Sequence, residues 1–325
     1  MKPNIAVVYG GDSAEFVVSV ESSKNVFRSI DPELYSAWKV QMKAGEWSVM
    51  KDDVKIADVD KSDFSFISEG KKIKFDYAYI TIHGTPGENG ILQGYLDLVQ
   101  VPYSTCSVGT SALTFNKYFC SNFLRSFGIK MAESVLINNT DSVDVDAIAD
   151  DLGLPLFVKP NAGGSSFGVT KVKSKDELKQ AIATALKEDT EVLIEQFIKG
   201  TEFTCGLVKL NGKNLVFPVT EVLPKKEFFD FEAKYTKGMT DEITPARLPE
   251  DLTIKCQALS STIYDLCRCE GIVRIDYILK DGDFYFLEVN TTPGMTGTSF
   301  VPQQIEAMGE KLSKVLSQII QQKLK

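Results

Sequence analysis

Hydrophobic and polar positions in the first hundred residues alternate between the patterns of strands and helices. Residues 4–11 form an apolar run that ends in two glycines, which predicts a buried strand followed by a tight turn. Residues 13–30 have helical periodicity, with Ser13 at the expected N-cap. A second strand is predicted over 75–83 and a second helix over 90–99. This alternation predicts an α/β domain with a parallel sheet wrapped by helices, and a ligand site at the carboxyl ends of its strands.

After residue 106 the pattern becomes that of α+β lobes. We expect a long helix over 110–128, a strand with a glycine-rich loop over 155–168, and a further helix over 175–188. The remaining chain is predicted to be rich in strands and to end in one helix over 303–325. We therefore predict three domains: an N-terminal α/β substrate domain over 1–106, a central lobe over 107–190, and a C-terminal lobe with a metal site and a lid loop over 191–325.

One predicted β-hairpin near the C-terminus carries the most informative polar pattern. At a strand period of two, Arg274 and Asp276 share a face of its first strand, and Glu288 and Asn290 share a face of the second. A three-residue loop with Gly282 in a left-handed conformation would bring the two pairs together, whereas a two-residue loop would put them on opposite faces. Carboxylate and amide oxygens suit Mg²⁺, and the arginine could neutralise a developing negative charge. The alternative is a hairpin whose polar face meets only water.

Composition and charge limit the classes of protein to consider. The chain has 325 residues, a net charge of −8 and a pI near 5.0, which argue against nucleic-acid and membrane-surface partners. It has no apolar run long enough for a membrane span, and its N-terminal residues lack a signal-peptide profile, so we expect a cytoplasmic protein. Six cysteines lie mostly in apolar runs, as expected of reduced, buried thiols, and their spacing does not favour a zinc site.

A glycine- and serine-rich loop over 163–168 follows the strand that carries Lys159. Its backbone amides and hydroxyl groups could surround phosphate oxygens, although a simple turn would have the same composition. The loop is not a Walker A motif, because Val169 stands where that motif requires lysine. The chain also contains no G-x-G, which disfavours the dinucleotide-binding fold.

Two further segments carry weaker signals. The run VLIEQFIKGTEF has strand character that breaks after Phe197, so Glu195 and Glu202 would flank a bend able to bind an adenine and a ribose. The charged and aromatic segment over 225–242, with Lys234 and Tyr235 at its centre, has no clean periodicity and is long enough for a lid.

The order of these motifs resembles one family over nearly the whole chain. The motifs YGGDSAEFVVS, IHGTPGENG, FVKPNAGGSSFGV, VLIEQF, FEAKYTKG, VRIDYIL and FLEVNTTPGMTGTSFVP are together similar to those of the D-alanine–D-alanine ligases of the ATP-grasp superfamily. The resemblance implies an ATP-grasp fold. It also implies a reaction in which ATP phosphorylates the carboxylate of one D-alanine and the amine of a second D-alanine attacks the acyl phosphate.

The resemblance implies roles for the residues of the ATP and metal sites. Lys117 and Lys159 would contact phosphates, and Lys234 would reach the γ-phosphate. The adenine and ribose would be held by three residues: Glu195, Glu202 and the backbone of Ile198. Two Mg²⁺ ions, with Mn²⁺ as a possible substitute, would be bound by three side chains: Asp276, Glu288 and Asn290.

The same resemblance implies roles at the amino-acid sites. Glu15 would hold the ammonium group of the first D-alanine and form a hydrogen-bonded triad with Ser165 and Tyr235. The oxyanion would be stabilised by Arg274 and the amide of Gly294. The remaining substrate contacts would come from Ser299, at the carboxylate of the second D-alanine, and from His83, which without the resemblance would count as structural.

Several alternatives and departures stay open at this point. A ligase that joins D-alanine to D-lactate or D-serine is the nearest alternative, followed by another ATP-grasp carboxylate–amine ligase, and Tyr235 favours an amine acceptor. A regulatory nucleotide-binding protein without turnover would be expected to lack some of the metal ligands. The resemblance further implies a homodimer with small-molecule substrates. Three positions depart from the usual family pattern: Asn116, Gln196 and Phe231.

Overall fold

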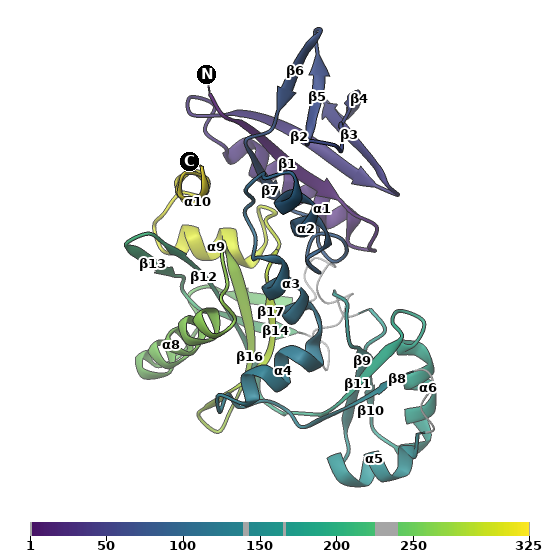
Figure 1. The fold of residues 1–325 in the computed structure, drawn as a ribbon. Helices are drawn as coiled ribbons and strands as arrows, with labels where there is room; N and C mark the ends of the chain where they lie inside the picture. The colour runs from purple at the N-terminus through teal and green to yellow at the C-terminus, as the bar shows by residue number, and fades with distance from the viewer. Residues whose placement is uncertain (1, 139–142, 165–166, 225–239, 325) are drawn as a thin grey trace.

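The computed structural model describes residues 2–138, 143–164, 167–224 and 240–324 (Figure 1). Three of the predicted site residues lie outside these ranges: Ser165, Lys234 and Tyr235. Phe231, one of the departures from the family pattern, also lies outside them. The described residues form three larger sheets and one two-stranded sheet.

The N-terminal sheet has five strands in the order β4-β3-β2-β1-β7. Their bounds are β1 Asn4–Gly10, β2 Ser36–Lys43, β3 Glu46–Lys51, β4 Val54–Asp58 and β7 Tyr77–Ile80. Alternate residues of β1 point to opposite faces: Ile5 packs with α1 (Phe16–Ser29) and α10 (Leu312–Lys323), and Ala6 packs with α2 (Ile91–Leu98). Strands β5 (Ser65–Ser68) and β6 (Lys71–Lys74) form the small separate sheet.

The parallel arrangement predicted for this domain is present where the chain alternates with helices. Strand β1 pairs in parallel with β2 and β7, whereas β3 and β4 extend the sheet as antiparallel strands, because a short turn connects each to its neighbour. The predicted N-cap was wrong: helix α1 begins after Glu15, and Ser13 lies in the preceding turn. There the hydroxyl of Ser13 donates to the carbonyl oxygen of His83 at 2.9 Å.

The central sheet has four antiparallel strands in the order β10-β9-β11-β8. Their bounds are β8 Ser134–Asn138, β9 Leu156–Pro160, β10 Thr170–Val172 and β11 Glu191–Gln196. Helices α5 (Val145–Leu152) and α6 (Lys175–Ala185) pack on this sheet in a common apolar cluster. The expected boundary after residue 190 falls just before β11, although β11 pairs with β8 and β9 and so lies within the central sheet.

The third sheet has the strand order β15-β14-β12-β16-β17, with β13 paired to β12. Its bounds are β12 Thr201–Leu210, β13 Lys213–Val216, β14 Thr220–Pro224, β15 Thr240–Ile243, β16 Val273–Lys280 and β17 Asp283–Asn290. Helices α3 (Val108–Phe115), α4 (Lys117–Arg125) and α8 (Glu250–Leu266) lie close to it, and α9 (Phe300–Ala307) packs against β12. One apolar cluster of this region contains all six cysteines, which are buried and free as the sequence predicted.

Two predicted long helices are divided in the structure. The helix expected over 110–128 is interrupted at Asn116, whose backbone is extended and whose side-chain oxygen accepts the amide of Phe119 at 2.9 Å. The helix expected over 303–325 is interrupted near Gly309, which has a left-handed φ of 78°. Both breaks follow from local capping, which a hydrophobic pattern does not reveal. Among the residues described, no helix is both long and apolar enough to cross a membrane.

Candidate active site

The predicted hairpin is formed by β16 and β17, and its polar pairs face each other. Asp276 lies opposite Glu288, and Arg274 lies opposite Asn290. The two pairs share a face although the loop has two residues, the length that was expected to put them on opposite faces. The strands are joined by a two-residue turn in which Asp281 and Gly282 both have positive φ, and a β-bulge between Asp276 and Tyr277 then shifts the register by one residue. The bulge therefore brings the two polar pairs to the same face, as an odd-length loop would have done.

Asp276 is the centre of a hydrogen-bonded group on this face. The residue is buried, and its carboxylate accepts hydrogen bonds from Arg274 Nε at 2.9 Å and Nη2 at 2.7 Å. It also accepts from Asn290 Nδ2 at 3.0 Å and from the hydroxyl of Thr204 at 2.5 Å. Burial alone would lower the pKa of Arg274, but the charge and hydrogen bonds of Asp276 outweigh it and raise that pKa above its ordinary value. The guanidinium therefore stays cationic in a buried position.

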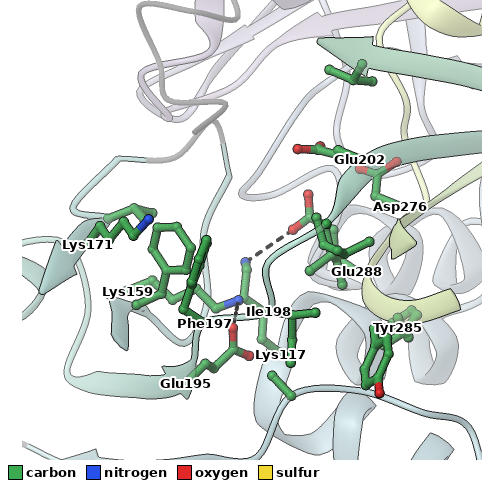
Figure 2. A pocket seen from close by; sticks show the side chains of 18 of the residues that line it. Lys117, Lys159, Lys171, Glu195, Phe197, Ile198, Glu202, Asp276, Tyr285 and Glu288 are labelled. Carbon is green, nitrogen blue, oxygen red and sulfur yellow. Dashed lines mark ion pairs between the residues drawn. The ribbon is translucent and has the colours of Figure 1, made fainter. Parts of the chain in front are cut away.

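A cavity of about 700 Å³ lies between the central and third sheets, within the size range of ligand sites (Figure 2). Eight of the predicted site residues line it: Lys117, Lys159, Glu195, Ile198, Glu202, Arg274, Asp276 and Glu288. They come from four separate segments of the chain, so the fold brings together residues that the sequence separates by up to 171 positions.

Lys117 and Lys159 are among the lysines that line this cavity (Figure 2). Lys159 Nζ lies 2.5 Å from Glu195 Oε2, and both side chains are 14% exposed. Lys117, the first residue of α4, donates to the carbonyl oxygen of Gly163 at 2.5 Å and lies 3.9 Å from Glu288 Oε2. Each cation is thus positioned by an oxygen on the cavity wall, where a phosphate could be bound in addition.

The predicted bend is the connection between two sheets. Strand β11 ends at Gln196 in the central sheet, and β12 begins at Thr201 in the third sheet. Phe197 lies in this connection, with Phe157 at a ring-centroid distance of 5.7 Å and Lys171 Nζ 3.6 Å from the centre of its ring. An aromatic wall beside exposed backbone is suited to a flat heterocycle.

His83 and Glu15 lie in the N-terminal domain and are not among the residues that line the cavity. His83 is 6% exposed, and its Nε2 lies 3.5 Å from the hydroxyl of Ser22. Burial lowers the pKa of His83, and the charge of Glu15 opposes that shift. A Cβ placed on Gly164 would lie 2.5 Å from Glu15 Oε2, so glycine at this position lets the loop before Ser165 approach Glu15 closely.

Gly294 and Ser299 lie in the loop between β17 and α9. The hydroxyl of Ser299 accepts the amide of Thr296 at 3.0 Å, and a Cβ on Gly294 would lie 2.8 Å from that hydroxyl oxygen. Met295 fixes this loop to helix α1: its amide donates to the hydroxyl of Ser22 at 3.1 Å, and its carbonyl oxygen accepts from Asn25 Nδ2 at 2.8 Å. The N-terminal domain therefore helps to position the loop.

Sequence reasoning missed Glu88, which contacts the same loop between β17 and α9. Its carboxyl accepts the amide of Gly84 at 2.7 Å and the amide of Thr292 at 3.2 Å. Burial raises the pKa of Glu88 to about 8, and the charge of Glu15 acts in the same direction. The available signal was an acidic residue inside HGTPGENG, a loop already assigned to the site. Lys171 was also missed, because nothing in its local sequence distinguishes it from a surface lysine.

The oxygen atoms of the hairpin are chemically suited to a hard cation. Two carboxylates and one amide share the face of β16 and β17, and Glu288 also borders the cavity. In the part of the chain that is described, no three His, Cys, Asp or Glu side chains lie close enough to enclose a metal on their own. This arrangement fits Mg²⁺, which takes few protein ligands and completes its shell with water and phosphate oxygens.

Comparisons with known proteins agree on one family. The family model for the D-ala D-ala ligase N-terminus matches residues 4–106, and that for the C-terminus matches residues 123–321. Proteins named D-alanine–D-alanine ligase from Phocaeicola vulgatus and Bacteroides fragilis are 52% and 50% identical over 324 residues, which is 99% of this chain and 100% of each relative.

Solved structures agree in fold along the chain. A D-alanyl-alanine synthetase A from Vibrio cholerae has a TM-score of 0.90 at 27% identity and covers 99% of this chain and 98% of its own. A D-Ala:D-Ser ligase from Enterococcus faecalis has a TM-score of 0.89 at 31% identity, with 99% of both chains covered. The α/β fold is therefore the ATP-grasp fold of these ligases. The chain belongs to the D-alanine–D-alanine ligase family.

Proposed function

We propose that the chain uses ATP to join two D-alanine molecules into D-alanyl-D-alanine for peptidoglycan synthesis. Its membership of the ligase family supports the reaction, and relatives about 50% identical over its length carry that name. The single observation that carries the proposal is the face of β16 and β17, where Arg274, Asp276 and Glu288 border a cavity that is also lined by Lys117 and Lys159.

The first step is the activation of a carboxylate, which is a poor electrophile. In our proposal Lys117 and Lys159 bind phosphate oxygens of ATP and reduce the charge that repels an attacking carboxylate. The adenine lies in the connection between β11 and β12, where Glu195, Ile198 and Glu202 contact the base and the ribose. Mg²⁺, or Mn²⁺ in its place, is proposed at Asp276, Glu288 and Asn290 as two ions, and when bound it neutralises charge on the transferring phosphoryl group.

The second step is attack by an amine on the acyl phosphate. Glu15 and His83 are proposed to hold the first D-alanine, and Ser299 the carboxylate of the second. The buried cation of Arg274 and the amide of Gly294 then stabilise the oxyanion of the tetrahedral intermediate. Arg274 suits this role because its bidentate bonds to Asp276 fix the orientation of the guanidinium before the substrate binds.

We further propose that the segment over 225–242 is a lid that protects the acyl phosphate from water. In this proposal Lys234 reaches the γ-phosphate, and Tyr235 joins Ser165 and Glu15 in a triad that forms on closure. Limited proteolysis checks it: we expect cleavage within 225–242 in the free protein and protection by ATP with a phosphinate analogue of the dipeptide. Equal cleavage with and without these ligands would contradict a lid.

Acceptor selectivity needs a direct measurement. Tyr235, neutral below about pH 10, does not repel the ammonium group of an incoming D-alanine. We therefore propose D-alanine as the acceptor, with D-serine as the second candidate because one structural relative is named a D-Ala:D-Ser ligase. Phosphate release and product mass should be measured with D-alanine alone and in mixtures with D-serine or D-lactate. Predominant depsipeptide or D-alanyl-D-serine formation would overturn the proposal.

We also propose that the protein acts in the cytoplasm, where ATP is available, and forms a homodimer. Its partners are then the small molecules ATP and D-alanine, without nucleic acid or membrane, as the net charge of −8 supports. Analytical ultracentrifugation would test the dimer, and a single species at the mass of one chain would contradict it.

A further inference from the structure

Glu88 connects two loops that belong to different domains. It lies in the loop between β7 and α2, and its carboxyl folds back to accept the amide of Gly84 at 2.7 Å through Oε2. The other oxygen, Oε1, accepts the amide of Thr292 at 3.2 Å, in the loop between β17 and α9. One side chain therefore satisfies two backbone donors that are 208 positions apart in the chain.

Both donors are neighbours of proposed catalytic groups. Gly84 directly follows His83, and Thr292 lies two residues after Asn290 and two residues before Gly294. Glu88 also borders a small cavity of about 30 Å³ with Lys117 and Glu288. The link thus runs from the proposed site of the first amino acid to the hairpin and to the proposed oxyanion donor.

The surroundings of Glu88 are unfavourable for an ionised carboxylate. Burial and the negative charges of Glu15 and Glu288 all disfavour the ionised form of Glu88, and only the two backbone hydrogen bonds favour it. A glutamate confined among other acids in this way resembles the groups that proteins keep at functional sites despite their cost in stability.

We propose that Glu88 is a positioning residue that fixes the loop of His83 against the loop of Gly294, so that the first substrate is aligned with the groups that stabilise the oxyanion. The inference rests on the proposed function. It also follows that both carboxyl oxygens are needed. Glutamine keeps the length of the side chain but has one acceptor oxygen, and its NH₂ group would face an amide N–H that also donates.

The kinetic test compares Glu88→Gln with Asn89→Ala. Asn89 is the matched control because it stabilises the same loop, accepting the amide of Ile91 at 3.2 Å and donating to the hydroxyl of Thr85 at 3.1 Å, without reaching Thr292. For Glu88→Gln we expect kcat to fall by about 10- to 100-fold while KM for ATP changes by less than about twofold, because misalignment affects the reaction more than nucleotide binding. For Asn89→Ala we expect kcat within about twofold of the unmodified protein. Equal kcat values for the two variants would overturn the proposal.

A second measurement does not depend on turnover. Hydrogen exchange should become faster in peptides containing Gly84 and Thr292 in Glu88→Gln, and in Asn89→Ala it should change only in the peptide containing Gly84. Unchanged exchange at Thr292 in Glu88→Gln would overturn the link whatever the protein synthesises. By contrast, absence of dipeptide from the unmodified protein would refute the proposed function alone, because the exchange result would still report the contact.

Discussion

The two ends of the hairpin formed by β16 and β17 carry acid–base pairs of the same chemistry in opposite surroundings. At one end, Asp276 holds Arg274 with two hydrogen bonds, and the two side chains are 8% and 16% exposed. At the other end, Asp283 lies 2.5 Å from Lys130 and 2.8 Å from Lys255, and all three side chains are between 38% and 56% exposed. The ion-pair distances at the two ends are similar. The burial of the side chains and the neighbouring cavity therefore distinguish the candidate active site from the solvated turn.

The two ends differ physically in how strongly water screens their charges. Around Asp283 water and salt screen each charge, so the ion pairs contribute little to folding. Arg274 and Asp276 are largely buried, so a guanidinium without its partner would be a poorly compensated buried charge. A buried pair of this kind can also act strongly on a ligand, because its field is not screened.

The largest expected effect is that of Arg274→Ala, which removes the buried cation. We expect kcat to fall by about 10³, since loss of one oxyanion donor costs about 10² to 10³ in comparable sites. Asp276 would also lose its bidentate partner, so the free energy of unfolding should fall by about 3 kcal/mol. Steady-state kinetics and urea unfolding would measure the two effects. A variant with kcat near that of the unmodified protein would contradict any special role of the buried end.

The next largest effect is expected for Glu288→Gln. The substitution keeps the shape of the side chain and removes one charge from the proposed Mg²⁺ site, so we expect kcat to fall by about 10² with folding retained. Higher Mg²⁺ concentration should restore part of the lost activity, because the remaining ligands bind the ion more weakly. Circular dichroism is the control for folding, and an unchanged dependence of activity on Mg²⁺ would remove Glu288 from the metal site.

A smaller effect is expected for Lys159→Met, because Lys159 and Glu195, both 14% exposed, are about as buried as Arg274 and Asp276 but are proposed to contact ATP and not the oxyanion. Loss of one charge-assisted contact to a phosphate should raise KM for ATP by about tenfold. Glu195 would keep its position on β11 but lose its cation. Isothermal titration with a non-hydrolysable ATP analogue would measure the binding, and an unchanged dissociation constant would show that Lys159 serves only the ion pair.

Much of this site could be predicted from the sequence, because its residues alternate along a predicted strand or lie next to glycines. The face shared by Arg274, Asp276 and Glu288 is present as expected, but it depends on a bulge that compensates for a two-residue loop and that was not foreseen. No local pattern indicates a bulge, since it is decided by how the strand packs on its neighbours. The helix breaks at Asn116 and Gly309 were missed for a related reason: the hydrophobic periodicity continues across both.

Glu88 and its contact with Thr292 show where sequence reasoning ends. The two residues are far apart in the chain, and each lies in a loop whose conformation depends on glycines and on contacts with another domain. Only the assembled fold shows that a carboxyl from one loop satisfies an amide of the other. The parallel strands of the N-terminal sheet were predictable, because strand and helix patterns alternate there.

The smallest effect is expected at the exposed end, for Asp283→Asn. Hydrogen bonds from Lys130 and Lys255 lower the pKa of Asp283 to about 2, below its ordinary value of 3.8. The folded state therefore binds fewer protons than the unfolded state between these values, so the pairs favour folding above pH 4 and lose their contribution as the pH falls toward 2.

The substitution Asp283→Asn removes this pH dependence. Because the group is exposed to water and salt, we expect Asp283→Asn to change kcat by less than about twofold and the midpoint of thermal unfolding at pH 7 by less than about 2 °C. The difference in midpoint between the variant and the unmodified protein should shrink further in 1 M NaCl. A loss of activity here as large as that of Arg274→Ala would show that the two ends of the hairpin are coupled, and that burial is not what distinguishes them.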